Sequence, residues 1–170
     1  MKKILFTISL LCLVPLAIYA QRKPSVRPTP VPKGVVVTEG VGIPGATVGR
    51  SSAQDIIKRF GTGYRKEVNK KYSYQLTYDR LGLSFYYCQA DKKEKIFLIE
   101  IKQPFRARTR RGVTLGVSTK EETQKIYGKP REGFQYPGIN FYYNRYGSRT
   151  VISEIDVLER GGIRQCHLMK

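Results

Sequence analysis

The sequence predicts an α+β protein of two tandem repeats, each a short helix followed by a three-stranded antiparallel meander. Two internal matches support this prediction. Residues 45–51, Gly-Ala-Thr-Val-Gly-Arg-Ser, return as residues 112–118, Gly-Val-Thr-Leu-Gly-Val-Ser, at an offset of 67 residues (112 minus 45). Residues 82–87, Gly-Leu-Ser-Phe-Tyr-Tyr, return as residues 138–143, Gly-Ile-Asn-Phe-Tyr-Tyr, at an offset of 56 (138 minus 82). An internal repeat indicates the architecture before any local propensity does.

The chain begins with the features of an export signal. Two lysines precede an apolar run over residues 4–18, and the small residue Ala20 stands before Gln21. This order is typical of a secretory signal peptide over residues 1–20, so we expect an exported protein, periplasmic or extracellular, with no transmembrane span after cleavage. An uncleaved anchor helix is the alternative, although the run is shorter than the ~20 residues that span a bilayer.

The composition is strongly basic. The chain has 31 Lys and Arg against 13 Asp and Glu, and loss of residues 1–20 removes two lysines, which leaves a formal net charge of +16 (29 minus 13). Such an excess raises the affinity for anionic partners and says nothing about the fold. The expected partners are an acidic protein or an anionic envelope component, with nucleic acid ranked below them. A solvated surface that only keeps the protein soluble is the alternative.

A basic, proline-rich linker precedes the first repeat. Residues 21–34 contain four prolines and four basic side chains, with almost nothing to bury, which predicts an extended spacer. The first repeat is expected over residues 35–102, and it opens with a short strand at residues 35–37.

Each repeat is expected to begin with a short helix. Ser51 with Gln54, and Ser118 with Glu121, match the capping box in which a hydroxyl and a side chain three residues later satisfy free backbone N–H groups. A glycine ends each helical pattern, Gly61 in the first copy. The apolar face of the first helix has helical spacing and consists of Ala53, Ile56, Ile57 and Phe60.

After each helix the apolar period changes from 3.6 to 2, which predicts strands. The strands expected in the first repeat are residues 72–78, 83–87 and 96–101. In the second repeat, residues 112–159, Glu154 and Asp156 alternate with apolar residues. We therefore expect one wet sheet face, while the other face receives the helix.

The pattern Gly-x-Thr-x-Gly-x-Ser, a short helix, Tyr-Gly-x-Pro and a tyrosine-rich meander resembles the αβ repeat of the β-lactamase inhibitory protein family and of the small lipoprotein of the outer-membrane β-barrel assembly complex. The best match is residues 112–118 with residues 127–130, and the resemblance covers residues 45–101 and 112–157. It implies a non-catalytic binding module for a protein or an envelope surface, inhibitor-like in its tandem arrangement. The motif encodes caps and turns, so it indicates the fold far better than the function.

Two cysteines remain once residues 1–20 are removed. Cys88 and Cys166 are an even pair in a compartment that permits disulfides. A bridge would tie the C-terminal tail, residues 160–170, to the first repeat, and two free thiols are the alternative. A zinc site needs about four Cys or His ligands, and His167 is the lone histidine. We therefore expect no metal site and no cofactor.

Arginines are concentrated in the join between the repeats, residues 103–111. If this join is extended, Arg106, Arg108 and Arg110 project from one side about 7 Å apart, a spacing suited to phosphate or carboxylate groups. Arg111 follows at once. These four arginines are the predicted binding residues, and a solvated linker is the alternative.

No catalytic constellation is found in the sequence. His167 has no serine or carboxylate pattern around it, and no Gly-Lys-Ser/Thr follows the glycines near residue 45. We therefore expect an exported, non-enzymatic binding module that presents a sheet face and the arginine join to its partner. The alternative is a charge-driven binder of nucleic acid or another anionic polymer.

Overall fold

The computed structural model describes residues 34–69, 72–160 and 166. The predicted signal peptide, the linker before Gly34 and His167 lie outside the described residues, as does most of the predicted tail. Neither helix in the described part is long and apolar enough to cross a membrane.

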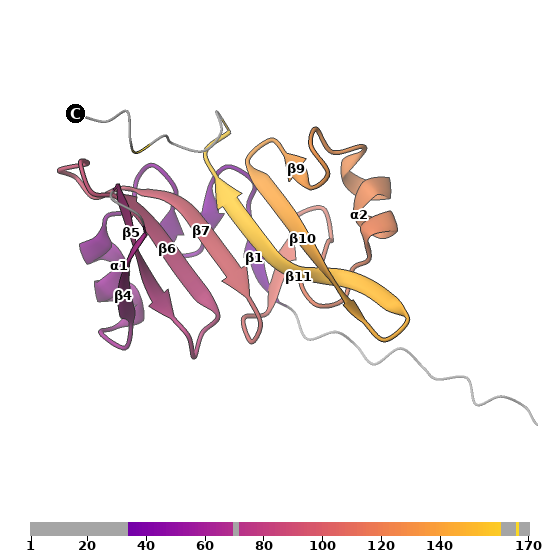
Figure 1. The fold of residues 1–170 in the computed structure, drawn as a ribbon, viewed down its shortest axis with the longest axis horizontal. Coiled ribbons are helices and arrows are strands. Elements are labelled where there is room, and N and C mark those ends of the chain that lie inside the picture. Colours follow the sequence, from indigo (N-terminus) through magenta and orange to yellow (C-terminus); the bar gives the residue numbers. More distant parts are fainter. Residues whose placement is uncertain (1–33, 70–71, 161–165, 167–170) are drawn as a thin grey trace, which may run out of the picture. The chain divides into compact units, whose positions relative to one another are not determined.

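A seven-stranded antiparallel sheet is the centre of the described chain, with the strand order β4-β5-β6-β7-β11-β10-β9 (Figure 1). Its strands are β4 (Arg65–Asn69), β5 (Ser73–Tyr78), β6 (Leu83–Cys88), β7 (Ile96–Lys102), β9 (Gln135–Tyr136), β10 (Ile139–Tyr146) and β11 (Arg149–Leu158). The two helices are α1 (Ala53–Phe60) and α2 (Lys120–Tyr127). Two small two-stranded sheets complete the fold, β1 (Val35–Val37) with β8 (Ala107–Thr109), and β2 (Gly42–Ile43) with β3 (Ala46–Thr47).

The predicted fold class is wrong. The described chain is mostly β, with two helices and one continuous seven-stranded sheet, and it does not form two tandem repeats of a helix and three strands. Helix α1 is followed by four strands, because Arg65–Asn69 adds the edge strand β4 beside β5. The prediction missed β4 because its sequence, Arg-Lys-Glu-Val-Asn, is mostly polar.

The sheet is continuous because β7 pairs with β11. In this pair Ile99 lies opposite Val157 and Ile101 opposite Ile155, and all four side chains are fully buried. Separated halves would each expose a sheet edge with unpaired N–H and C=O groups next to these apolar side chains. The pairing of β7 with β11 gives these N–H and C=O groups hydrogen-bond partners, and it also buries the apolar side chains along the line where the two strands meet.

Both helices pack on the apolar face of the sheet. Phe60 of α1 lies 5.4 Å from Phe85 of β6, centroid to centroid, and Tyr127 of α2 lies 5.1 Å from Phe141 of β10. Opposed residues of six neighbouring strands form one buried apolar row beneath them. The row consists of Leu76, Phe85, Ile99, Val157, Ile139 and Tyr136.

Both helix caps lie one residue later than predicted. Ser52 caps α1 and forms the capping box with Asp55, and Thr119 with Glu122 does so for α2. Ser51 does not cap the helix because its hydroxyl accepts the backbone N–H of Thr47 at 3.0 Å. The hydroxyl of Ser118 likewise accepts the N–H of Thr114 at 3.0 Å, so in both copies the first serine closes the turn before the helix.

Candidate functional site

The arginine join contains a strand. Strand β8 runs parallel to β1, with Ala107 opposite Val35 and Thr109 opposite Val37. The side chains of Ala107 and Thr109 are buried, 0% and 2% exposed. Since successive residues of a strand point to opposite sides, this burial turns the residues between and beside them outward.

All four predicted arginines are exposed, and three of them alternate in the chain with the buried residues of this strand. Arg106, Arg108 and Arg110 are all exposed and alternate with the buried residues of β8. We call these three residues the arginine comb. The prediction required an extended backbone here, and the structure is extended at residues 107–109, while Arg110 begins the following turn.

The fourth arginine has a different environment. The guanidinium carbon of Arg111 lies 4.8 Å from the ring centroid of Tyr127 on α2. The Tyr127 hydroxyl donates a hydrogen bond to Glu39. Burial and this carboxylate raise the pKa of Tyr127 above its ordinary value. Arg111 thus contacts α2 in addition to being exposed, and its replacement would alter packing as well as charge.

An apolar groove lies beside the arginine comb. Its cavity volume is about 610 Å³, and Arg106 is one of its lining residues. The apolar side chains that line it are Pro104, Phe105, Ala107, Leu115 and Val117. Val117 is 41% exposed, so apolar surface is open to solvent next to a positive charge.

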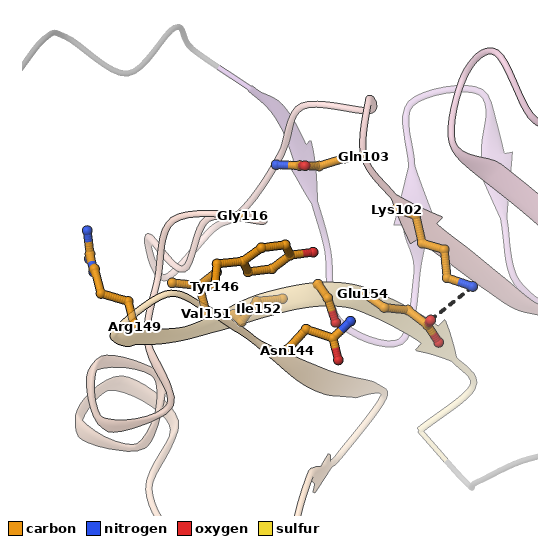
Figure 2. Close-up of a pocket in the computed structure, with 10 residues that line it drawn as sticks. Lys102, Gln103, Gly116, Asn144, Tyr146, Arg149, Val151, Ile152 and Glu154 are labelled. Atoms are coloured by element: carbon orange, nitrogen blue, oxygen red, sulfur yellow. Dashed lines mark ion pairs between the residues drawn. The ribbon is translucent and has the colours of Figure 1, made fainter.

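A second cavity, of about 520 Å³, is lined by the end of β7, the loop at Gly116 and the β10–β11 hairpin (Figure 2). Gln103 lines both this cavity and the apolar groove. Figure 2 shows the Lys102 ammonium turned toward Glu154, and the two charged groups lie 3.0 Å apart. Arg149 and Lys102 both line this cavity, so each cavity has at least one cationic residue in its lining.

The sheet face that carries Glu100 and Asp156 has a polar row. Opposed residues of all seven strands contribute to it, and each of them is polar. The row consists of Arg65, Thr77, Ser84, Glu100, Asp156, Asn140 and Gln135. We call the face that carries it the outer face, because the buried apolar row lies on the other side of the same strands.

The centre of the polar row is buried. Ser84, Asn140 and Asp156 are only 5%, 3% and 6% exposed. The expectation of a wet outer face is therefore wrong at Asp156. Glu100 on the adjacent strand β7 and Asn140 on the adjacent strand β10 lie directly opposite it.

The environment of Asp156 is unusual for a carboxyl group. Burial, followed by the negative charges of Glu154 and Glu100, raises the pKa of Asp156 to about 8. Its Oδ1 atom is buried and has no hydrogen-bond partner among the residues that the structure describes. A group of this kind can hold a proton near neutral pH or take an additional ligand.

The sequence contains a signal for this row, which served above only to predict the repeats. Ser84 and Asn140 occupy equivalent places in the match at offset 56, and so do Glu100 and Asp156. Sequence comparison alone shows the equivalence of each pair. Only the register, with Glu100 opposite Asp156 and the other two on the flanking strands, brings all four together.

Cys88 and Cys166 are a disulfide-capable pair in the structure. Their sulfur atoms are joined, and their Cα atoms lie 5.1 Å apart. Both are buried in a small cluster with Phe97 and Leu98, against which Tyr86 packs. The predicted pairing of these two cysteines is thus seen, at the end of β6 beyond the polar row.

Comparisons with models of protein families, with curated proteins and with solved structures found no match to this chain.

Proposed function

We propose that the protein is an exported, non-enzymatic binding module that docks an acidic protein or an anionic envelope component on the arginine comb and the adjoining apolar groove. The observation that carries the proposal is the alternation along β8, where buried Ala107 and Thr109 hold the neighbouring arginines outward. Guanidinium groups form paired hydrogen bonds with carboxylates and phosphates. Because a strand already fixes the backbone that carries these arginines, less conformational entropy is lost on binding.

The groove gives the proposed surface more than charge. Apolar side chains beside Arg106 suit a partner that presents an acidic residue next to an apolar one, as proteins do. A uniform polyanion would leave this apolar surface unused. Residues 112–118 and 127–130 resemble a family of non-catalytic binding modules, and this resemblance supports a binding role without indicating the partner.

A matched pair of variants tests this proposal. In the first, the three residues of the arginine comb are replaced by Gln, and Arg111 is kept because it packs on Tyr127. In the second, three exposed lysines, Lys92, Lys93 and Lys129, are replaced by Gln. Both variants lose three positive charges, so a difference between them does not come from net charge.

The proteins are immobilised, exposed to envelope extract, and washed at graded salt, and the retained partner is quantified. We expect the comb variant to retain at least 10-fold less partner than the lysine variant, since each lost guanidinium contact costs on the order of 1 kcal/mol or more. Equal losses in the two variants would mean that net charge alone matters, and would refute the comb as a site. Sequencing of the protein's N-terminus from the exported fraction tests export, with Gln21 as the expected first residue.

The second candidate function is charge-driven binding of nucleic acid or another anionic polymer, favoured by the formal net charge of +18 of the full chain. Salt distinguishes the two. Binding to duplex DNA should fall steeply between about 50 and 200 mM salt, because each neutralised phosphate releases a counterion. Binding of a protein partner through the groove should survive this range.

A further inference from the structure

Three carboxylates meet on the outer face of this basic protein. Glu100 comes from β7, while Glu154 and Asp156 come from β11, and the pairing of these strands places Glu100 directly opposite Asp156. One oxygen of each carboxylate lies within 4.8 Å of the other two. Like charges at such distances repel, so the cluster needs a positive group to balance it.

Lys102 balances only part of the cluster. Its ammonium lies 2.8 Å from an oxygen of Glu100 and 3.0 Å from an oxygen of Glu154. The hydroxyls of Ser84 and Tyr86 also donate hydrogen bonds to Glu100, at 3.4 and 3.0 Å. Against three carboxylates, a single lysine leaves a formal local charge of −2 when all of them are ionised.

The independent observation is the buried oxygen of Asp156. The residue is 6% exposed, and its Oδ1 has no hydrogen-bond partner in the part of the chain that the structure describes. A buried polar atom without a partner costs free energy, and native proteins leave few of them. This oxygen belongs to one of the three residues whose carboxylates meet, so a cation bound by the Asp156 carboxylate can supply its missing partner.

We propose that Glu100, Glu154 and Asp156 form a binding site for a hard divalent cation, with Ca²⁺ as the preferred ion. Such ions select oxygen ligands, and two further buried residues of the polar row, Ser84 and Asn140, carry neutral oxygens beside the carboxylates. The double charge of the ion offsets more of the negative charge of the cluster than the single charge of the Lys102 ammonium does. Ca²⁺ is preferred because it accepts irregular geometry, whereas Mg²⁺ demands a tight octahedron that side chains from paired strands do not readily form.

Lys102 acts in this site as an internal competitor. The ion and the ammonium compete for the carboxylates of Glu100 and Glu154, and the Lys102 side chain is 48% exposed, so it can turn out to solvent when the ion binds. Removal of the Lys102 ammonium therefore distinguishes a cation site from a cluster of ion pairs that only stabilises the fold. The site should bind Ca²⁺ more tightly without the lysine.

The test is calorimetric titration of the purified protein with CaCl₂, together with tyrosine fluorescence, which no tryptophan masks in this chain and to which Tyr86, one of 12 tyrosines, contributes beside Glu100. We expect one Ca²⁺ per chain. Asp156→Asn and Glu100→Gln should each weaken binding at least 10-fold, and Lys102→Met should strengthen it about 10-fold. The control is Asp79→Asn, which removes an exposed carboxylate paired with Arg65 and should leave the affinity unchanged.

Three results would overturn the site. The first is an absence of stoichiometric Ca²⁺ binding at millimolar concentration in the wild type. The second is an Asp156→Asn variant that binds as the wild type does, and the third is a Lys102→Met variant with unchanged affinity, which would exclude Glu100 and Glu154 as ligands. The comb lies at and beside β8 and the cluster on β7 and β11, so failure of this proposal leaves the proposed binding function untouched, and the reverse also holds.

Discussion

Asp156 shows how the register of a sheet creates an environment that its own sequence neighbours do not. Ile155 and Val157 flank it in the chain, and their alternation predicts a carboxylate in water. The structure instead places it between β7 and β10, where it is buried against Glu100 and Asn140. The resulting pKa of about 8 has a measurable consequence for stability.

The first prediction concerns Asp156→Asn and pH. Because the folded-state pKa of Asp156 is raised from 3.8 to about 8, the folded protein keeps a proton between these pH values that the unfolded chain has lost. The free energy of unfolding should therefore fall as pH rises through this window, by up to about 1.4 kcal/mol per pH unit, and level off above pH 8. Asparagine cannot titrate, so the variant should lose this slope and be the more stable protein at pH 8.

Urea denaturation at pH 5, 6, 7 and 8 in the presence of a chelator measures this slope. The other groups around Asp156 are Glu100, Glu154, Lys102, Tyr86 and Tyr142. Burial lowers the pKa of Lys102, but its hydrogen bonds to both glutamates outweigh this and raise it. Burial raises the pKa of Tyr142 to about 12, and that of Tyr86 also lies above its ordinary value, so neither phenol titrates below pH 8. An identical slope in the wild type and the variant would contradict the assignment.

The second prediction concerns Cys88 and Cys166. The bridge closes a loop across a sequence separation of 78 residues, and in the chain-entropy model such a loop stabilises the fold by about 4 kcal/mol. We expect no alkylatable thiol from these residues in denatured, non-reduced protein recovered after export. Cys166→Ser should lower the melting temperature by about as much as reductant lowers that of the wild type. Two alkylatable thiols in the non-reduced wild type would refute the bridge.

At the scale of elements, the two helices match in their caps and differ in what they bury. Ile56 of α1 is fully buried in the main core, with Ala53 beside it. In α2 the buried residue is Thr123, whose hydroxyl donates to the carbonyl of Thr119 at 2.8 Å. Helix α2 therefore relies more on the ring of Tyr127, which packs on Tyr136 and Phe141.

The third prediction follows from this difference. Ile56→Ala should lower the free energy of unfolding by about 2 to 4 kcal/mol, because it leaves a cavity between α1 and the sheet. Ile57→Ala, on the half-buried flank of the same helix, is the matched control and should cost less. Urea denaturation of both variants measures the difference. Equal costs would show that α1 does not bury the face that the structure assigns to it.

At the scale of the whole molecule, the continuous sheet makes the two halves of the chain depend on each other. Strand β11 covers one edge of β7, and the apolar row crosses that seam from Ile99 to Val157. The disulfide links the same two halves, since Cys88 ends β6 and Cys166 lies beyond β11.

The fourth prediction is that a chain ending at Arg110 does not fold cooperatively. It lacks α2 and strands β9, β10 and β11, so β7 becomes an edge strand with Ile99 and Ile101 uncovered. Circular dichroism against temperature should show no cooperative transition near that of the full-length protein. A cooperative transition near the full-length temperature would mean that the first half is an independent domain.

Much of the local structure was predictable from the sequence. The apolar spacing of Ala53 to Phe60 predicts α1, and the alternation around Phe85 and Ile99 predicts two of the central strands. The features that could not be predicted are those that depend on contacts with other strands or with other residues of the fold. Strand β4 has no apolar period of its own and exists because β5 offers it a free edge. The spacing of Ser51 fits a helix cap, but its hydroxyl instead accepts a hydrogen bond from the backbone N–H of Thr47.

The candidate surfaces divide in the same way. By itself the sequence determined that arginines alternate over residues 106–110, that two cysteines can pair, and that the motifs around Glu100 and Asp156 match, because these are properties of residue order. Only the tertiary structure decided that β8 pairs with β1, an arrangement in which the arginine comb is exposed. It also decided that the matched motifs lie opposite each other in one sheet. The physical reason is that burial and charge at a residue depend on side chains many positions away in the chain, and these come near only when the strands have paired.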